Sequence, residues 1–370
     1  MTTLKILKAS HGDGFILTVK KEDQEFNMII DGGPGDLHSI RELKLQLRQL
    51  PQIDMIVLTH YDRDHIGTLI KNFEEIKKYI TPDTILWVNL PQLIQMPSDD
   101  PNLSYREALD LGKYLKKLEK EKGITLRFHE KIVAGYEFQD QNNLISIKVI
   151  SPTESEIEEN LRHLEKKEAP DESYKATLLA HSQITDAETP KPLEELIDRD
   201  YTKKQVVNDS SMAFWVKTAD GVGILFGGDA SAKVMTDGLK LFGHDTGNPL
   251  EVDLYKVSHH GSKYNVSDAL LGAVKTSAYL FSTNGGANGS HHPDRETIAR
   301  ILLHPARNRE QTITLFFNYS REEIEKKNPK FLTDEDISNS TYNFNIKDKV
   351  SDISFPIDST ENPIDSTEKR

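Results

Sequence analysis

Short apolar runs, each bounded by turn-forming or charged residues, fill the first part of the chain. They lie at residues 4–7, 15–19 and 26–30, and they predict three β-strands. At residues 39–50 the apolar side chains instead recur every three or four positions, and Pro51 follows. This spacing predicts a helix with one face packed on a sheet.

Mixed strands and helices continue as far as residue 317. Further strands are predicted at residues 55–58, 85–88, 124–128, 144–150, 212–216, 222–226, 254–257, 278–282 and 313–317. Helices are predicted at residues 105–122, 231–241, 267–274 and 295–303. This order indicates layers of mixed α and β structure, and the chain length allows two domains or one large layered domain.

Two segments differ in composition from the rest. Residues 153–204 are charged and helix-prone without a clear ligand set, so we interpret them as a helical insertion or lid. Residues 321–370 are polar, and the sequence Ile-Asp-Ser-Thr at 357–360 recurs at 364–367. We expect these residues to form a C-terminal extension whose last dozen residues are disordered.

The chain contains no cysteine, so it forms no disulfide and offers no thiolate ligand. Any bound metal must therefore be held by imidazole and carboxylate groups. The N-terminal residues lack the apolar region of a signal peptide, and no later apolar run approaches the roughly 20 residues of a membrane span. We expect a cytoplasmic protein with no membrane partner.

The formal net charge of −13 bears on the choice of partner. A protein that follows a nucleic-acid backbone normally offers a basic surface. The five lysines between positions 113 and 122 are interleaved with Glu119 and Glu121 on a predicted helix, which favours a solvated helix face. Composition alone therefore does not predict binding to a long duplex.

The densest set of chemically active side chains follows the predicted strand at residues 55–58. His60, Asp62 and Asp64 alternate, so their side chains can converge in an extended loop, while His65 offers a second imidazole in another direction. This arrangement suits two metal ions. The alternative is structural, because Asp and His also cap helices and Asp64 or His65 could begin a helix through residue 73.

This segment resembles the HxHxDH signature of the metallo-β-lactamase superfamily, with Asp62 in place of the second His. The HxDxDH variant resembles the soluble hydrolase domain of the ComEC/Rec2 competence proteins. The resemblance implies a four-layer αββα sandwich of α/β (α+β) class. It favours one hydrolase domain over residues 1–320, with the insertion inside it and residues 321–370 outside it.

Further segments match the same family in order. Leu225 to Asp229 resembles the strand end that carries the family's bridging carboxylate, and residues 254–262 resemble its KVxHHGS segment. Residues 282–293 resemble its Asn and His-Pro segment, and residues 11–15 its Gly-Asp loop. Asn208 and Ser211 match its Asn and Ser before a strand.

The resemblance assigns roles to these residues. One divalent ion would be held by Asp64, His65, Asp229 and His259, and the other by His60, Asp62 and the bridging Asp229. Catalytic roles fall to Asp64, Asp229 and His292. Substrate contact or support of the ligands falls to Asp13, Asp31, Asn208, Ser211, His260, Ser262 and His291.

The second ion lacks one ligand of the superfamily pattern, because Asn208 and Ser211 stand where most members supply a further histidine. His163 and His181 are the nearby alternatives, although both suit an exposed surface. The set of carboxylates and imidazoles favours zinc and manganese equally.

The function that follows is a metal-dependent hydrolase, most simply a phosphodiesterase or nuclease that uses a water activated by two metals. One alternative is hydrolysis of a small phosphodiester or nucleotide, which the acidic surface suits better than a long duplex. A second alternative is a non-catalytic subunit with a vestigial metal site, which would act by binding a protein partner. The sequence does not identify the substrate or the oligomeric state.

Overall fold

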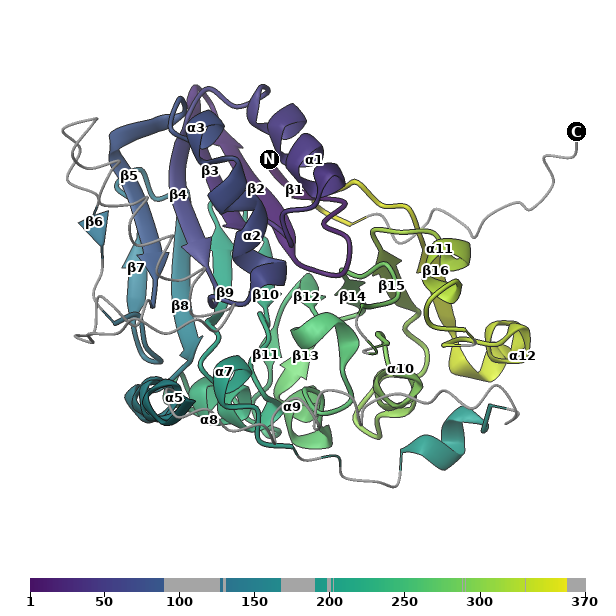
Figure 1. The fold of residues 1–370 in the computed structure, drawn as a ribbon. Coiled ribbons are helices and arrows are strands. Elements are labelled where there is room, and N and C mark those ends of the chain that lie inside the picture. Colours follow the sequence, from purple (N-terminus) through teal and green to yellow (C-terminus); the bar gives the residue numbers. More distant parts are fainter. Residues whose placement is uncertain are drawn as a thin grey trace, which may run out of the picture.

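The computed structural model describes residues 1–89, 127–128, 131–167, 190–197, 201, 203–287, 289, 291–329 and 331–357. The helix predicted at residues 105–122 lies outside these residues, as does most of the strand predicted at 124–128. Figure 1 shows two sheets with helices on their outer sides. The predicted αββα sandwich is confirmed.

The first sheet has seven strands in the order β17-β1-β2-β3-β4-β5-β6. Strands β17, β1, β2 and β3 pair in antiparallel fashion, whereas β3 to β6 are parallel. The strands are β1 (Thr2–Ile6), β2 (Gly14–Lys21), β3 (Gln24–Asp31), β4 (Ile53–Leu58), β5 (Ile80–Val88), β6 (Arg127–Phe128) and β17 (Asp352–Ser354).

The second sheet has eight strands in the order β16-β15-β14-β12-β10-β9-β8-β7. It is antiparallel from β7 to β10 and parallel from β10 to β16. The strands are β7 (Glu137–Gln139), β8 (Ile145–Ser151), β9 (Ala213–Thr218), β10 (Gly223–Phe226), β12 (Leu254–Lys256), β14 (Ala278–Phe281), β15 (Ile313–Phe317) and β16 (Phe344–Lys347). A small separate sheet pairs β11 (Leu250–Glu251) with β13 (Val274–Lys275).

Helices cover the outer face of each sheet (Figure 1). The first sheet is covered by α1 (Leu37–Leu47), α2 (Arg63–Lys71) and α3 (Phe73–Ile76), and the second by α8 (Ala232–Leu241), α9 (Asp268–Ala273) and α10 (Arg295–Leu303). Shorter or peripheral elements are α5 (Glu154–Lys167), η2 (Leu193–Leu196), α7 (Val206–Asp209), η3 (Ser258–Gly261), α11 (Arg321–Glu325), α12 (Asp334–Ser338) and η4 (Ser340–Tyr342). Within the described part of the chain, no helix is both long enough and apolar enough to cross a lipid bilayer.

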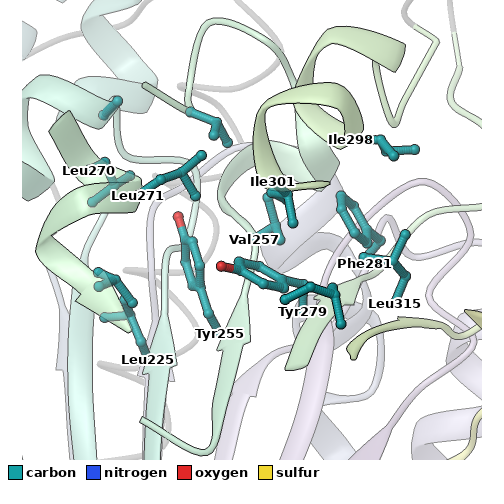
Figure 2. Packing of buried hydrophobic residues seen from close by; sticks show 14 of the residues in the cluster. Leu225, Tyr255, Val257, Leu270, Leu271, Tyr279, Phe281, Ile298, Ile301 and Leu315 are labelled. Atoms are coloured by element: carbon teal, nitrogen blue, oxygen red, sulfur yellow. The ribbon is translucent and has the colours of Figure 1, made fainter. Parts of the chain in front are cut away.

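Three buried apolar clusters fill the three spaces between the four layers. Successive residues of a strand point to opposite faces, so Ile224 and Phe226 of β10 face the other sheet while Leu225 faces the helices. Figure 2 shows the outer cluster of the second sheet, where Tyr255 and Tyr279 lie beneath side chains from α9 and α10. The sequence thus produces strands that are buried on both faces.

The polar segment after residue 320 is part of the sandwich as far as residue 357. Its strand β17 pairs with β1 at the edge of the first sheet, and β16 pairs with β15 at the edge of the second. Ile353 and Phe355 are buried between the sheets. Residues 321–357 are therefore not an extension outside the domain, which corrects that expectation; residues 358–370 lie outside the described residues.

The segment expected as an insertion or lid also contacts the core where it is described. In α5, Ile157 and Asn160 are buried, and the Asn160 side chain accepts a hydrogen bond from the Tyr61 hydroxyl (2.7 Å) and donates one to Ser210 Oγ (2.6 Å). Leu193 of η2 is buried in the cluster beneath α10. These parts of residues 153–204 pack as fixed elements of the fold.

Helix α8 approaches strand β8 closely at Gly238, and this contact generates a stability prediction. A Cβ atom added at Gly238 would overlap the backbone carbonyl of Ile150. Helix propensity alone would make Gly238→Ala stabilising by about 1 kcal/mol. We expect the overlap to outweigh this gain and to destabilise the protein by roughly 1–3 kcal/mol, measured as a lower urea midpoint.

The control for this prediction is Lys240→Ala in the same helix, where the side chain is 56% exposed. That change should alter the free energy of unfolding by less than about 0.5 kcal/mol. A Gly238→Ala protein as stable as the parent would show that α8 can move away from β8.

Candidate metal centre

The candidate residues gather where strands of both sheets end. His60 follows β4 of the first sheet, while Asp229 follows β10 and His259 follows β12 of the second. Figure 1 shows the start of α2 beside the ends of β10 and β12. Loops from the two sheets therefore meet at one edge of the sandwich.

The loop after β4 both begins a helix and carries candidate metal ligands, the two alternatives that the sequence left open. Helix α2 begins at Arg63 with Asp62 at its N-cap position, yet the Asp62 side chain makes no capping hydrogen bond. Its Oδ2 atom lies 3.6 Å from His60 Nε2 instead. The helix fixes the backbone, and the side chains of Asp62, Asp64 and His65 remain directed at the centre.

The loop after β12 places two adjacent imidazoles on different sides of Asp229. His259 (φ 48°, ψ 51°) and His260 (φ 55°, ψ 15°) both adopt left-handed backbone conformations, and Gly261 follows with φ 92°. Non-glycine residues rarely adopt this conformation. Residues with strained backbone conformations cluster at functional sites, so this run supports a functional role for the loop.

Asp229 lies between these groups and is almost fully buried. Its Oδ1 atom is 3.4 Å from His65 Nε2. Its Oδ2 atom is 3.7 Å from His259 Nε2 and 3.9 Å from His60 Nε2. The two oxygens of one carboxylate thus face different imidazoles, as expected of a bridging ligand.

Asp64, His65 and His260 form a second group around a common point. Asp64 Oδ2 lies 3.5 Å from His260 Nε2 and 4.0 Å from His65 Nε2. The sequence-based assignment placed His259 here and left His260 outside the ligand set. The structure instead places His260 with Asp64 and His65, and His259 on the Oδ2 side of Asp229.

Four buried polar atoms at this centre have no hydrogen-bond partner among the described residues. They are the Nε2 atoms of His60, His65 and His260, and Oδ1 of Asp229. Because buried polar atoms are nearly always satisfied, their convergence identifies this point as a candidate site for a cation. Imidazole and carboxylate groups at these separations fit divalent cations such as zinc or manganese.

The ring orientation of His65 is fixed from the first sheet. Its Nδ1 atom lies 2.7 Å from Asp31 Oδ2, and Asp31 also accepts hydrogen bonds from the Thr59 backbone N (2.8 Å) and hydroxyl (2.7 Å). A carboxylate accepts from Nδ1–H, so Nε2 is left as the nitrogen that could bind a metal. Asp31, expected from the sequence to be a supporting residue, is therefore in contact with His65.

His260 is oriented in the same way by the second sheet. Its Nδ1–H donates to the carbonyl oxygen of Ser282 (2.8 Å) and lies 3.3 Å from Asp13 Oδ1. Asp13 in turn pairs with Lys256, and both side chains are 1% exposed. Sequence reasoning missed Lys256; its signal was a lone lysine inside the apolar run 254–257.

Asn208 and Ser211 contact the two imidazoles on the Oδ2 side of Asp229. Asn208 Nδ2 lies 3.2 Å from His259 Nδ1, and Ser211 Oγ lies 3.3 Å from His60 Nδ1. These residues therefore lie beside two of the candidate ligands. Of the alternatives, His181 and the side chain of His163 lie outside the described residues.

Asn265 also contacts His259 and was missed by sequence reasoning. Its Oδ1 atom lies 3.1 Å from His259 Nδ1, and its Nδ2 donates to the carbonyl oxygen of Asp229 (2.9 Å). Ser262 forms the turn between them, since its backbone N donates to the carbonyl oxygen of His259 (2.9 Å).

The histidines of the last motif lie beside the centre. The ring of His292 is 5.2 Å from that of His259 and 6.5 Å from that of His260, centroid to centroid. Its Nδ1 atom lies 3.7 Å from Asp294 Oδ2. His291 has a buried Nδ1 atom with no partner among the described residues, and neither histidine belongs to a metal-binding group there.

The carboxylates control the protonation of the imidazoles when no cation is bound. Burial alone would lower the pKa of His260, but the carboxylates of Asp13, Asp64 and Asp229 together outweigh this effect and raise that pKa to about 10. The pKa of His65 is also raised well above its usual range, because Asp229 and other carboxylates outweigh burial. His259 differs, since burial prevails there and lowers its pKa to about 4.

Comparison with known proteins gives one family model and one curated relative. The family model described as "Metallo-beta-lactamase superfamily" matches residues 15–87. ComE operon protein 3 of Bacillus subtilis (strain 168) is 20% identical over 265 residues, which is 71% of this chain. The chain spans about a quarter of that relative, since the match covers 24% of its length.

Solved structures match at low identity over most of the chain. The metallo-beta-lactamase fold protein YhfI from Bacillus subtilis is 9% identical, covers 96% of this chain and all of its own, and gives a TM-score of 0.42. A long form RNase Z from yeast is 11% identical, with 98% of this chain and 49% of that chain covered and a TM-score of 0.41.

The first test of the centre is Asp64→Asn, which removes a charge from the group with His65 and His260. We expect metal affinity to fall by more than roughly 100-fold, since even supporting residues are worth 10- to 100-fold. Elemental analysis of the dialysed protein measures the loss, and far-UV circular dichroism should be unchanged. Asp237→Asn on the surface of α8 is the charge-matched control; equal metal content in both variants would contradict the assignment.

Proposed function

We propose that this chain is a metal-dependent phosphodiesterase of metallo-β-lactamase fold, which hydrolyses a P–O ester bond with a metal-activated water. The observation that carries the proposal is the convergence of unpartnered imidazole and carboxylate atoms on both sides of Asp229. A vestigial site in a non-catalytic subunit would not need to keep such a set of buried polar atoms free of partners.

The residues that would hold the metals divide around Asp229. Asp64, His65 and His260 would hold one divalent ion, and His60, Asp62 and His259 the other, with Asp229 between them. Two bound ions supply a water of lowered pKa and stabilise charge on the attacking and leaving oxygens. This set has four imidazoles and three carboxylates, so zinc and manganese are both proposed.

The substrate would approach from the side of Asp62 and Asp64. Their side chains are 31% and 26% exposed, whereas the side chains of His60, His65 and Asp229 are at most 3% exposed. The buried groups would hold the metal ions from the interior of the protein. The exposed groups are where a phosphoryl oxygen can enter.

His292 is proposed to contact the substrate phosphate or to protonate the leaving oxygen. Its ring lies beside those of His259 and His260 yet outside the groups that surround Asp229. Its side chain is 15% exposed, so it borders both the centre and solvent. An imidazole in this position can act as an acid or as a hydrogen-bond donor.

The second candidate differs in the substrate, which would be a small phosphodiester or nucleotide instead of a nucleic acid. The net charge of −13 favours it, because an acidic protein repels a small anion less than it repels a long duplex. Elemental analysis followed by assays with manganese or zinc on bis(p-nitrophenyl) phosphate, a cyclic dinucleotide, single strands and duplexes separates the candidates. A metal-loaded protein that hydrolyses none of them would favour the non-catalytic alternative.

A pair of variants separates substrate contact from metal binding. We expect His292→Ala to keep its metal content and to lose roughly 100-fold in turnover, the usual value of acid catalysis. His259→Ala should lose metal as well, because its Nε2 faces Asp229 Oδ2 at 3.7 Å. Elemental analysis and turnover of bis(p-nitrophenyl) phosphate are measured on both; loss of metal from His292→Ala would make His292 a ligand.

A further inference from the structure

Two tyrosines and two lysines gather beside the histidines of the metal centre. Tyr201 and Tyr264 form an edge-to-face pair with ring centroids 6.3 Å apart. Lys263 Nζ lies 4.7 Å from the centroid of the Tyr201 ring and 5.9 Å from that of Tyr264. Lys203 Nζ lies 5.7 Å from the Tyr264 centroid. We call these four residues the Tyr–Lys cluster.

Residues 263–265 connect this cluster to two histidines of the centre. Asn265, the next residue after Tyr264, contacts His259 Nδ1 at 3.1 Å. The backbone N of Lys263 donates to Asp294 Oδ2 (2.8 Å), and that carboxylate oxygen is 3.7 Å from His292 Nδ1. Residues 263–264 are therefore positioned directly alongside His259 and His292.

The cluster presents its groups in part to solvent. Tyr201, Lys263 and Tyr264 are partly buried, and Lys203 is exposed. Lys263 also pairs with Glu296 at 2.9 Å, and this contact together with the aromatic rings holds its ammonium group in place. The centre is thus bordered by two aromatic rings, the ion-paired Lys263 and the exposed Lys203.

Cations interleaved with aromatic rings are the groups that bind single-stranded nucleic acid. In such proteins the cations contact backbone phosphates and the aromatic rings stack on bases. The bases of a duplex are paired with each other and are therefore not available for this stacking. In a protein with a net charge of −13, a strand needs such a local set to overcome repulsion. A simple phosphodiester, with one phosphate at the metals, would leave the cluster unused.

We propose that the Tyr–Lys cluster is a binding subsite for the nucleotide next to the scissile phosphate, so that the substrate is a single-stranded polynucleotide. This inference rests on the proposed function for the chemistry but names a substrate class that the metal centre alone does not. Lys203 contacts a neighbouring phosphate, and Tyr201 and Tyr264 contact its base.

The test separates binding from hydrolysis. Binding of a fluorescein-labelled 12-nucleotide single strand to the full chain is measured by fluorescence anisotropy in EDTA, with DNA and RNA arms and a duplex arm. We expect Lys203→Ala to raise the Kd for the single strand about five- to tenfold and to reduce the slope of log Kd against log salt by about 0.7. Lys203→Arg should restore both.

The matched control is Lys233→Ala, an 86% exposed lysine of α8 that pairs with Asp237. In the metal-loaded protein, the ratio of kcat/KM for the strand to that for bis(p-nitrophenyl) phosphate should fall about five- to tenfold in Lys203→Ala and in Tyr201→Ala. The ratio should not change in the Lys233→Ala control.

The outcomes distinguish this inference from the proposed function. Loss of hydrolysis on every substrate would reject the function, while the anisotropy measurement would still decide whether the cluster binds a strand. An unchanged Kd in Lys203→Ala would overturn the inference and leave the phosphodiesterase standing. An equal fall on both substrates would show that the cluster only supports the fold, and duplex binding as tight as that of the single strand would reject base stacking.

Discussion

The burial of carboxylates at the meeting point of two sheets is the constraint on which this structure depends. Asp13, Asp31 and Asp229 are each at most 2% exposed. A buried carboxylate is costly unless it is paired and hydrogen-bonded. Lys256 pairs with Asp13, and the imidazole of His65 pairs with Asp31. These pairs, and the cations proposed at Asp229, offset the free-energy cost of burying charged groups in an apolar core.

The same pairs connect the two halves of the sandwich. Lys256 ends β12 of the second sheet, whereas Asp13 precedes β2 of the first. The backbone N of Asp13 donates to the carbonyl oxygen of Asp64 (3.2 Å), and no room exists there for a side chain at Gly12. The centre therefore forms only when both sheets have packed together, which would couple the proposed metal binding to folding.

The sequence predicted the features that depend on local pattern. Apolar runs and helical spacing located the strands and helices around the centre, including residues 295–303 and 313–317, because burial on a sheet imposes these periods. The edge strands β16 and β17 carry weak apolar signals and pair with distant strands, so the polar composition after residue 320 concealed them. Asn160 of α5 was concealed likewise, because its partners Tyr61 and Ser210 are distant in sequence.

The HHG motif did not predict which of His259 and His260 lies beside Asp64. Both are adjacent imidazoles in one loop, and the positive φ angles that separate them are not encoded in the residue types. Which imidazole meets Asp64 is decided by tertiary contacts. The Ser282 carbonyl oxygen and Asp13 fix Nδ1–H of His260, while Asn265 Oδ1 accepts from Nδ1–H of His259. Each Nε2 atom is thereby held toward the carboxylates of the centre by contacts that need no cation, and this is the orientation that the proposed metal ions would require.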